Sequence, residues 1–319
     1  MPSSALQQWH PPPFLFEAAL MTQRLLPFFL VFLLWASPAV SATWTDAVGR
    51  TVQVPDHPQR LVSLVPSLTE ILFALNLGDR LVGATQFCTY PPAAAQVPRV
   101  GNYMQPSLEA IVASKPDLVF ASADMAAPAL VAQLDKIGIA TFVVAPRDLD
   151  STIATIRTIG SVLEETATAD RLARGMEEAF CRIRAATENR PRPRVLLAIM
   201  VNPLTVAGPN TLGHHLIETA RGINVVPNGP GRYPTWSMEA VLAADPDVII
   251  VSPNPGEANP AAHFAAWPQL RAVRENRVIT IPDPDWVYRP GPRLILGLEA
   301  IARALHGSEL RLEDASCAP

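Results

Sequence analysis

The chain contains the same 14-residue pattern twice. The two copies run from Ser107 to Phe120 and from Ser237 to Ile250, and they align without a gap. Each copy begins with a serine that suits a helix N-cap, continues with a glutamate and a short apolar-faced helix, and ends in a Pro-Asp turn and a buried strand. A unit that recurs 130 positions apart predicts two similar lobes, because the repeats of a solenoid lie much closer together.

The composition supports a folded protein and excludes one broad class of partner. Of the 319 residues, 49% are hydrophobic, so the chain can bury a core instead of remaining disordered. The net charge is −4, and no run of lysine or arginine occurs. Nucleic-acid binding requires a basic surface, so we expect no nucleic acid among the partners.

The N-terminus, residues 1–42, has the pattern of an upstream extension followed by a secretory signal peptide. Arg24 precedes an apolar block of about 11 residues, and small residues lead to Ala42. That block is shorter than the roughly 20 residues of a membrane-spanning helix, which is the weaker alternative. We expect export with cleavage after Ala42, and translation from Met21 with Met1 as the alternative start. No cysteine lies near the cleavage site, so we expect a soluble mature protein and no lipoprotein.

Beyond residue 42, strand patterns alternate with helix patterns, which is typical of parallel sheets covered by helices on both faces. We divide the mature chain into a first lobe (43–147), a connector (148–190), a second lobe (191–311) and a tail (312–319). The connector is helical, with a break near residues 166–168. Its second piece, about 169–188, would extend on the order of 30 Å. That helix is either a strut between the lobes or an ordinary surface helix of the first lobe.

The three cysteines are too few and too widely spaced for a zinc knuckle or a disulfide framework. They are Cys88, Cys181 and Cys317, so at most one pair can form. An exported protein meets an oxidising environment. A Cys181–Cys317 disulfide is therefore an open alternative, which the spacing does not decide.

Signatures of catalysis and metal binding are absent from the sequence. We find no Gly-x-Ser-x-Gly nucleophile motif, no phosphate-binding loop, no dinucleotide Gly-x-Gly-x-x-Gly and no His-Glu-x-x-His. The neighbours His214 and His215 would point about 100° apart on a helix, which does not suit one metal ion. We predict no catalytic residue, no metal site and no cofactor, and we keep an exported two-lobed α/β enzyme as an alternative.

The aromatic residues indicate a ligand-binding cleft. Seven of them fall in loops after predicted strands, where an α/β sheet presents its ligand crevice. Such rings suit a large, flat, partly apolar ligand, because they supply stacking surface while Tyr and Trp keep a polar group. Aromatic packing between loops is the alternative. The seven residues are Phe87, Tyr90, Tyr103, Tyr233, Trp236, Trp286 and Tyr288.

Three glutamates near helix starts have different explanations. Glu109 and Glu239 occupy the same place in the two copies. A helix dipole favours an acid anywhere in the first turn, so it does not explain this correspondence, and we interpret both as exposed anchors that dock the lobes on a partner. Glu70 follows Ser67 by three residues, which fits a capping box, and we interpret it as structural.

Several stretches resemble one family. They are Arg60–Glu70, Tyr90–Pro92, Val97–Gly101, the paired Ser-x-Glu helices and Lys115–Val119. Over about residues 44–306 the chain is similar to the periplasmic substrate-binding proteins of iron-complex and cobalamin ABC importers, and most similar to the members that bind cobalamin. The resemblance implies an α/β fold of two Rossmann-like lobes joined by one long backbone helix, the class III architecture. It also implies a periplasmic monomer that delivers its cargo to a permease dimer and its ATPase and performs no chemistry.

The resemblance further assigns roles to single residues. Glu109 and Glu239 match the positions that engage arginines of the two permease subunits. A corrinoid would be held between the lobes by residues at six matching positions. These are Phe87, Tyr103, Tyr233, Asp285, Trp286 and Arg289.

The chain departs from the cobalamin-binding pattern at three places. Ser122 and Ile199 stand where large aromatic rings are expected, and Ala220 stands where a second-lobe cysteine is expected. The smaller side chains weaken the corrinoid assignment and leave the fold assignment intact. A ferric siderophore or haem is therefore the alternative cargo, and haem would need an axial ligand such as Tyr103 or Tyr233.

Overall fold

The computed structural model describes residues 41–124, 128–253, 259–312, 315 and 317. The predicted start sites and nearly all of the predicted signal peptide fall in residues 1–40 and lie outside the described residues. Ser41 and Ala42 begin β1 (Ser41–Thr45), which pairs with β2 (Thr51–Pro55) in a two-stranded sheet. Within the described part of the chain, no helix is both long and apolar enough to cross a membrane.

The first lobe is built on a four-stranded parallel sheet, as the strand pattern predicts. The strand order is β4 (Leu81–Ala84), β3 (Leu61–Ser63), β5 (Leu118–Ser122) and β6 (Ala140–Val144). Alternate side chains of the strands enter two separate apolar layers. One layer contains α2 (Pro66–Ala74) and α5 (Leu149–Val162), and the other contains α3 (Leu108–Ala113) and α4 (Pro128–Lys136). Two 3-10 turns, η1 (Gly78–Arg80) and η2 (Pro92–Gln96), lie between strands and helices.

The second lobe, from β7 to α12, has a mixed sheet. Its order is β11 (Val278–Thr280), β10 (Val248–Val251), β7 (Arg194–Val201) and β8 (Leu204–Val206), with β9 (Ile223–Asn224) also paired to β7. The β7–β8 pair is antiparallel, and the sequence does not predict it because a three-residue strand is too short to show a period. One face packs on α7 (Leu212–Thr219) and α12 (Leu294–His306). The other packs on α8 (Met238–Ala244), α9 (Ala262–Ala265) and α10 (Arg271–Arg274).

The two copies of the repeat fold alike. Ser107 caps α3 and Ser237 caps α8, each by accepting the backbone N–H of the third helical residue. Each helix leads into a parallel strand at the centre of its sheet, β5 in the first lobe and β10 in the second. The duplicated pattern therefore marks the same helix-turn-strand unit in both lobes.

The Pro-Asp turn of each copy is tied to the neighbouring strand by matched hydrogen bonds. Asp117 accepts the backbone N–H of Arg60 just before β3, and Asp247 accepts that of Arg194 at the start of β7, both at 2.8 Å. The guanidinium of each arginine donates in return to a backbone carbonyl at the end of α3 or α8. These bonds join helix end, turn and strand, which explains why the aspartate recurs in the pattern.

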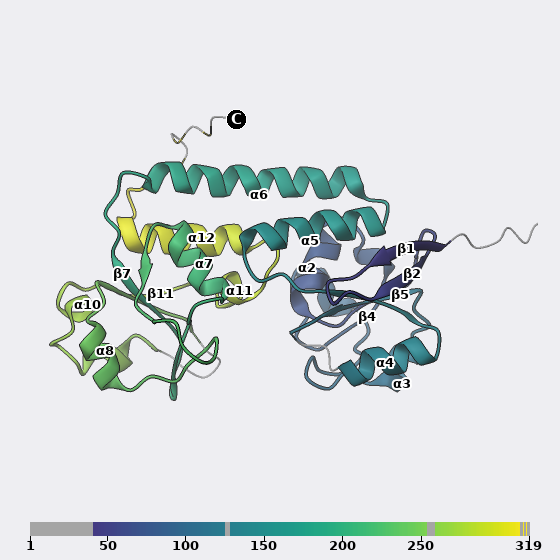
Figure 1. The fold of residues 1–319 in the computed structure, drawn as a ribbon, viewed down its shortest axis with the longest axis horizontal. Coiled ribbons are helices and arrows are strands. Elements are labelled where there is room, and N and C mark those ends of the chain that lie inside the picture. Colours follow the sequence, from purple (N-terminus) through teal and green to yellow (C-terminus); the bar gives the residue numbers. More distant parts are fainter. Residues whose placement is uncertain (1–40, 125–127, 254–258, 313–314, 316, 318–319) are drawn as a thin grey trace, which may run out of the picture. The chain divides into compact units, whose positions relative to one another are not determined.

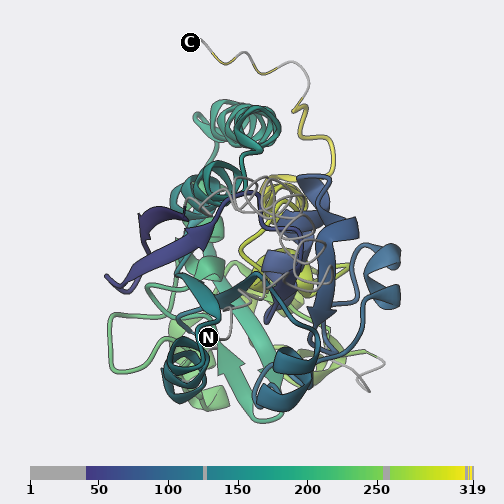
Figure 2. The ribbon, with the colours of Figure 1, turned by 90° about the vertical axis from the view of Figure 1, so that its right-hand side faces the viewer.

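A long helix connects the lobes. α6 (Thr166–Thr187) follows α5 after a break at residues 163–165, slightly before the predicted position. Its 22 residues extend about 33 Å. It packs on α5 and also on α7 and α12, and Figures 1 and 2 show α6 as the outermost of these helices. α6 therefore acts as a strut shared by both lobes, while the residue boundaries of the lobes remain predictions.

A disulfide joins α6 to the tail. Cys181 pairs with Cys317, with Cα atoms 5.9 Å apart, which decides the alternative that the spacing left open. Cys88 is buried and has no disulfide partner. The bridge attaches the C-terminal tail to α6. Cys181 therefore has a disulfide partner even though position 220, where the resemblance predicts a cysteine, is an alanine.

Two glycines test how closely α5 and α6 pack. An added Cβ at Gly160 of α5 would collide with the Cβ of Ala169 in α6, whereas one at Gly175 of α6 meets nothing within 4 Å. We expect Gly160→Ala to lower the free energy of unfolding by about 1–3 kcal/mol, because overpacking displaces backbone. We expect Gly175→Ala to raise it by about 0.5–1 kcal/mol, because alanine favours the helix. Urea unfolding of the mature protein measures both, and equal effects would contradict this helix interface.

Candidate ligand-binding site

A pocket of about 360 Å³ lies between the two lobes. In the first lobe it is lined by residues at strand ends, since Val65 and Ser67 follow β3, Ser122 ends β5 and Pro146 follows β6. These are the carboxyl ends of parallel strands, where open α/β sheets bind their ligands. The second lobe contributes Asp285, Tyr288, Arg289 and Pro290.

Two aromatic rings of the first lobe form one wall of the pocket. Phe87 and Tyr103 both line it, with ring centroids 4.9 Å apart and planes at 75°, an edge-to-face arrangement. Phe87 remains 45% exposed, so packing between loops leaves part of its ring surface accessible to a ligand. The wall offers apolar surface and one phenol to a ligand.

The second-lobe wall comes from a single helical turn that the sequence does not predict. In α11 (Asp285–Tyr288), Asp285, Tyr288 and the following Arg289 line the pocket, because positions i, i+3 and i+4 share one helix face. Trp286 lies on another side of the turn and does not line the pocket. The segment is expected as a loop, since a four-residue helix shows no helical period.

Tyr288 is a pocket residue that the six assigned positions omit. Its hydroxyl donates to the carbonyl of Ile199 at 3.5 Å. Burial raises the pKa of Tyr288 above its ordinary value, the Ser252 hydroxyl lowers it and the neighbouring Tyr233 raises it, so the phenol stays neutral at physiological pH. Its spacing of three residues from Asp285 is the signal that points to a shared helix face.

Four of the seven aromatic residues singled out in the sequence lie outside the pocket lining: Tyr90, Tyr233, Trp236 and Trp286. Tyr233 is 45% exposed, and its ring centroid lies 5.8 Å from the guanidinium of Arg232. Arg232 donates at 3.3 Å to Asp124, a pocket residue of the first lobe. Trp236 packs against the core of the second lobe. Tyr233 therefore stands beside a contact between the lobes, next to the pocket.

A buried carboxylate lies behind the charged part of the pocket. Glu70 is 3% exposed and pairs with Arg293 at 2.7 Å and Arg289 at 3.1 Å. The predicted capping box is wrong, because α2 begins at Pro66 and Ser67 lies inside the helix without capping it. The partners of Glu70 are more than 200 positions away in the sequence, so no local pattern reveals them.

Asp285 places a carboxylate next to a guanidinium in the pocket. It pairs with Arg289 at 2.9 Å and with Arg293 at 3.3 Å. Burial raises the pKa of Asp285, Arg289 lowers it and Asp283 raises it, and the result is a pKa above the ordinary value. The adjacent acceptor and donor together can bind a primary amide, which has both kinds of group.

Glu109 and Glu239 lie at the exposed starts of α3 and α8. Ser107 donates to Glu109 at 3.0 Å. The backbone N–H of Glu109 and the Ser107 hydroxyl lower the pKa of Glu109, and the Ser237 hydroxyl and the backbone N–H of Glu239 lower the pKa of Glu239. Figure 1 places both helices on the side opposite α6, one in each lobe. The structure therefore presents two matched carboxylates that are ionised at neutral pH.

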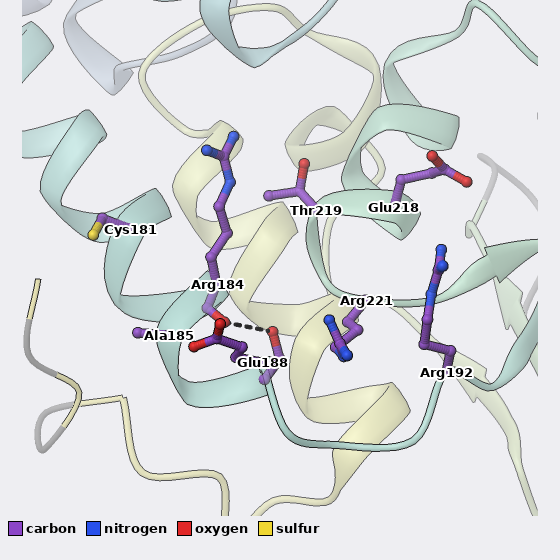
Figure 3. A pocket seen from close by; sticks show the side chains of 9 residues that line it. Cys181, Arg184, Ala185, Glu188, Arg192, Glu218, Thr219 and Arg221 are labelled. Atoms are coloured by element: carbon purple, nitrogen blue, oxygen red, sulfur yellow. Dashed lines mark hydrogen bonds between the residues drawn. The ribbon is translucent and has the colours of Figure 1, made fainter.

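A second cavity, of about 550 Å³, lies at the ends of α6 and α7 (Figure 3). Arg184, Arg192 and Arg221 line it together with Glu188 and Glu218. The C-terminal ends of helices favour cations, which accounts for Arg184 in the last turn of α6 and Arg221 just after α7. The described residues around this cavity include no aromatic ring, so it offers no stacking surface and is the weaker candidate.

Among the residues that the structure describes, no group of three or more His, Cys, Asp or Glu side chains could hold a metal ion. The ring of His214 instead contacts the side-chain amide of Asn224 at 3.2 Å. Burial lowers the pKa of His214, which leaves it neutral at physiological pH.

Comparison with known proteins places the chain in a family. The sequence profile described as periplasmic binding protein matches residues 61–284. The vitamin B12-binding protein of Photorhabdus laumondii is 30% identical over 251 residues, which cover 78% of this chain and 88% of that protein.

Solved structures agree with this assignment. The periplasmic vitamin B12-binding protein of Vibrio cholerae is similar with a TM-score of 0.72 at 26% identity, over 78% of this chain and 97% of that one. A periplasmic haem-binding protein from Pseudomonas aeruginosa is similar with a TM-score of 0.70 at 30% identity, over 79% of this chain and 94% of that one.

These relatives confirm the resemblance and the class III architecture predicted from the sequence. Relatives in the family are substrate-binding proteins of ABC transporters that carry a ligand as cargo, so the alternative of an exported enzyme is wrong. The family is periplasmic and works with a permease and an ATPase. The chain therefore belongs to the periplasmic binding protein family and is a substrate-binding protein, not an enzyme.

Proposed function

We propose that this protein binds cobalamin or a related corrinoid between its lobes and delivers it to the permease of an ABC importer in the inner membrane. The observation that carries the proposal is the make-up of the pocket, which combines the ring pair Phe87 and Tyr103 with the charged pair Asp285 and Arg289. Relatives that bind vitamin B12, in sequence and in structure, support this cargo.

A corrinoid has the chemistry that these groups would bind. The faces of its macrocycle are broad and largely apolar, which suits aromatic rings, and its edge carries amide groups. Amide N–H groups can donate to Asp285, and amide carbonyls can accept from Arg289. We propose these two residues with Phe87 and Tyr103 as the central contacts. Tyr233 and Trp286 would join them only by turning toward the ligand, since neither lines the pocket.

Haem is the second candidate cargo, and one observation favours it. Tyr103 presents a phenol to the pocket, and a tyrosine can serve as an axial ligand of haem iron. Ser122, at the pocket wall, is smaller than the ring expected there for cobalamin. The similar haem-binding structure supports this alternative. A ferric siderophore is the remaining cargo of this kind.

We also propose that Glu109 and Glu239 dock the lobes on the two subunits of a permease dimer, which an ATPase powers. The support is that both carboxylates are exposed and have the same local geometry. In this proposal the protein is a monomer without a lipid anchor, exported to the periplasm and cleaved after Ala42. Cleavage there would leave residues 43–45 of β1 to pair with β2.

Tryptophan fluorescence titration tests the cargo. We expect micromolar cyanocobalamin to quench the emission of the mature protein with one-to-one stoichiometry, because Trp286 lies in the helical turn that borders the pocket. We expect Phe87→Ala to weaken binding about tenfold, the effect of losing about 1.4 kcal/mol of ring contact.

Hemin and a ferric siderophore are titrated in parallel. Absence of quenching by cyanocobalamin would remove the corrinoid proposal. Binding of hemin alone, with its axial-ligand absorption band lost in Tyr103→Phe, would establish the haem alternative in its place.

Charge reversal tests the docking surface. We expect Glu109→Lys combined with Glu239→Lys to abolish uptake by the permease, because both contacts become repulsive to arginine, and to leave ligand affinity within about twofold. The matched control is Glu178→Lys combined with Glu188→Lys, which reverses two exposed charges, one on α6 and one at its C-cap. Uptake through the reconstituted transporter that survives reversal of Glu109 and Glu239 would refute the docking role.

A further inference from the structure

Glu70 joins the two lobes directly behind the pocket. Its Oε1 accepts from Arg293 at 2.7 Å and from Arg289 at 3.1 Å, and its Oε2 accepts from Arg293 at 2.8 Å. Glu70 lies in α2 of the first lobe, whereas both arginines lie between α11 and the start of α12 in the second. A single buried carboxylate thus binds two guanidiniums from the other lobe.

We propose that Glu70 is a positioning residue of the ligand site. It holds the guanidinium of Arg289 in the orientation that meets the ligand, and through Arg293 it fixes the spacing of the two pocket walls. This inference rests on the proposed function for the role of Arg289. The joining of the lobes by Glu70 does not depend on which cargo binds.

The contacts of Arg289 show why one lobe alone cannot orient it. Its Nε pairs with Asp285 of its own lobe at 2.9 Å. Its Nη1 donates to Glu70 at 3.1 Å and its Nη2 to the carbonyl of Phe87 at 3.4 Å, both in the first lobe. An arginine side chain has many rotamers, and fixing it costs conformational entropy. The orientation of the guanidinium is therefore fixed only when both lobes are in place. One of the groups that fix it is the backbone carbonyl of Phe87, whose ring forms the opposite wall of the pocket.

Arg293 makes the second half of this connection. Its exposed fraction is 9%, and besides Glu70 it pairs with Asp283 at 2.9 Å. Its guanidinium also lies 4.1 Å from the ring centroid of Tyr90 in the first lobe, within the range of a cation–π contact. Burial alone would lower the pKa of Arg293, but Glu70 and the two aspartates raise it above the ordinary value. The buried guanidinium of Arg293, which contacts both lobes, therefore fixes the separation of the lobes more firmly than a solvent-exposed ion pair would.

Asp283 is the control for the alternative that Glu70 only stabilises the charged cluster and does not position Arg289. It pairs with Arg293, as Glu70 does, but it belongs to the second lobe and does not line the pocket, and the ion pairs of Arg289 among the described residues are with Glu70 and Asp285. Removing its charge disturbs the same cluster without releasing Arg289 from the first lobe. A purely structural cluster would respond in similar ways to loss of either carboxylate.

The experiment is a double-mutant cycle between Glu70 and Arg289, read as cyanocobalamin affinity of the full mature protein. We expect Glu70→Gln and Arg289→Gln each to weaken binding at least about tenfold, and Asp283→Asn to weaken it less than about threefold. The combined Glu70→Gln and Arg289→Gln variant should bind at least about threefold more tightly than the product of the two single losses would give, because part of the effect of Glu70 passes through Arg289. Additive losses, or a loss in Asp283→Asn equal to that in Glu70→Gln, would overturn the inference.

A second readout needs no ligand. Hydrogen exchange of the unliganded protein should rise in both α2 and the α11–α12 segment in Glu70→Gln, and only in the latter segment in Asp283→Asn. If Glu70→Gln does not fold, Glu70→Asp keeps the charge on a shorter side chain and enters the same cycle. Failure of the wild type to bind cyanocobalamin, hemin or a siderophore removes the proposed function alone. Unchanged exchange in α2 removes the inference, whatever the cargo.

Discussion

The buried ion pair between Glu70 and Arg293 is the contact on which the arrangement of the lobes depends. A carboxylate or guanidinium taken out of water without a partner costs several kcal/mol. Each lobe carries one half of the pair, so neither half can be buried at low cost unless the lobes meet in this register. The ion pair therefore does more to select one arrangement of the two lobes than to raise the free energy of unfolding of the protein.

Stability comes instead from apolar packing. One continuous apolar cluster includes strands of both sheets together with α2, α5, α6, α7 and α12, and burial of such surface is the main favourable term in folding. The lobes are thus joined along α6, behind the pocket at Glu70 and beside the pocket between Arg232 and Asp124. Separate attachments of this kind resist hinge bending, so the pocket walls are held near their final positions before a ligand arrives, and little binding energy is spent on ordering them.

The sequence predicts the parts of this structure that leave a local pattern. Buried runs such as Ala140–Val144 become parallel strands, and the long helical period becomes α6. The same local reasoning misassigns Glu70, because a capping box is visible within four residues while an arginine more than 200 positions away is not. It also misses α11, which is stabilised by tertiary contacts and is too short to show a period. The rings Phe87 and Tyr103 could be assigned to the pocket only through their place after strands and the family resemblance.

The two copies of the repeat have stayed alike on one side of the molecule and diverged on the other. At the helix starts, Ser107 and Ser237 make the same caps beside matched glutamates. At the strand ends, 130 positions apart, Ser122 lines the pocket, whereas Ser252 is buried and does not line it.

The tyrosines that precede the two helices differ in the same way, since Tyr103 lines the pocket and Tyr233 does not. A partner made of two equal subunits would select equal contacts from both lobes, and the helix starts provide them. A ligand held between the lobes makes no such demand, because its two faces and edges differ. The first lobe could therefore specialise in ring surface and the second in charge, while the starts of α3 and α8 kept the original duplication.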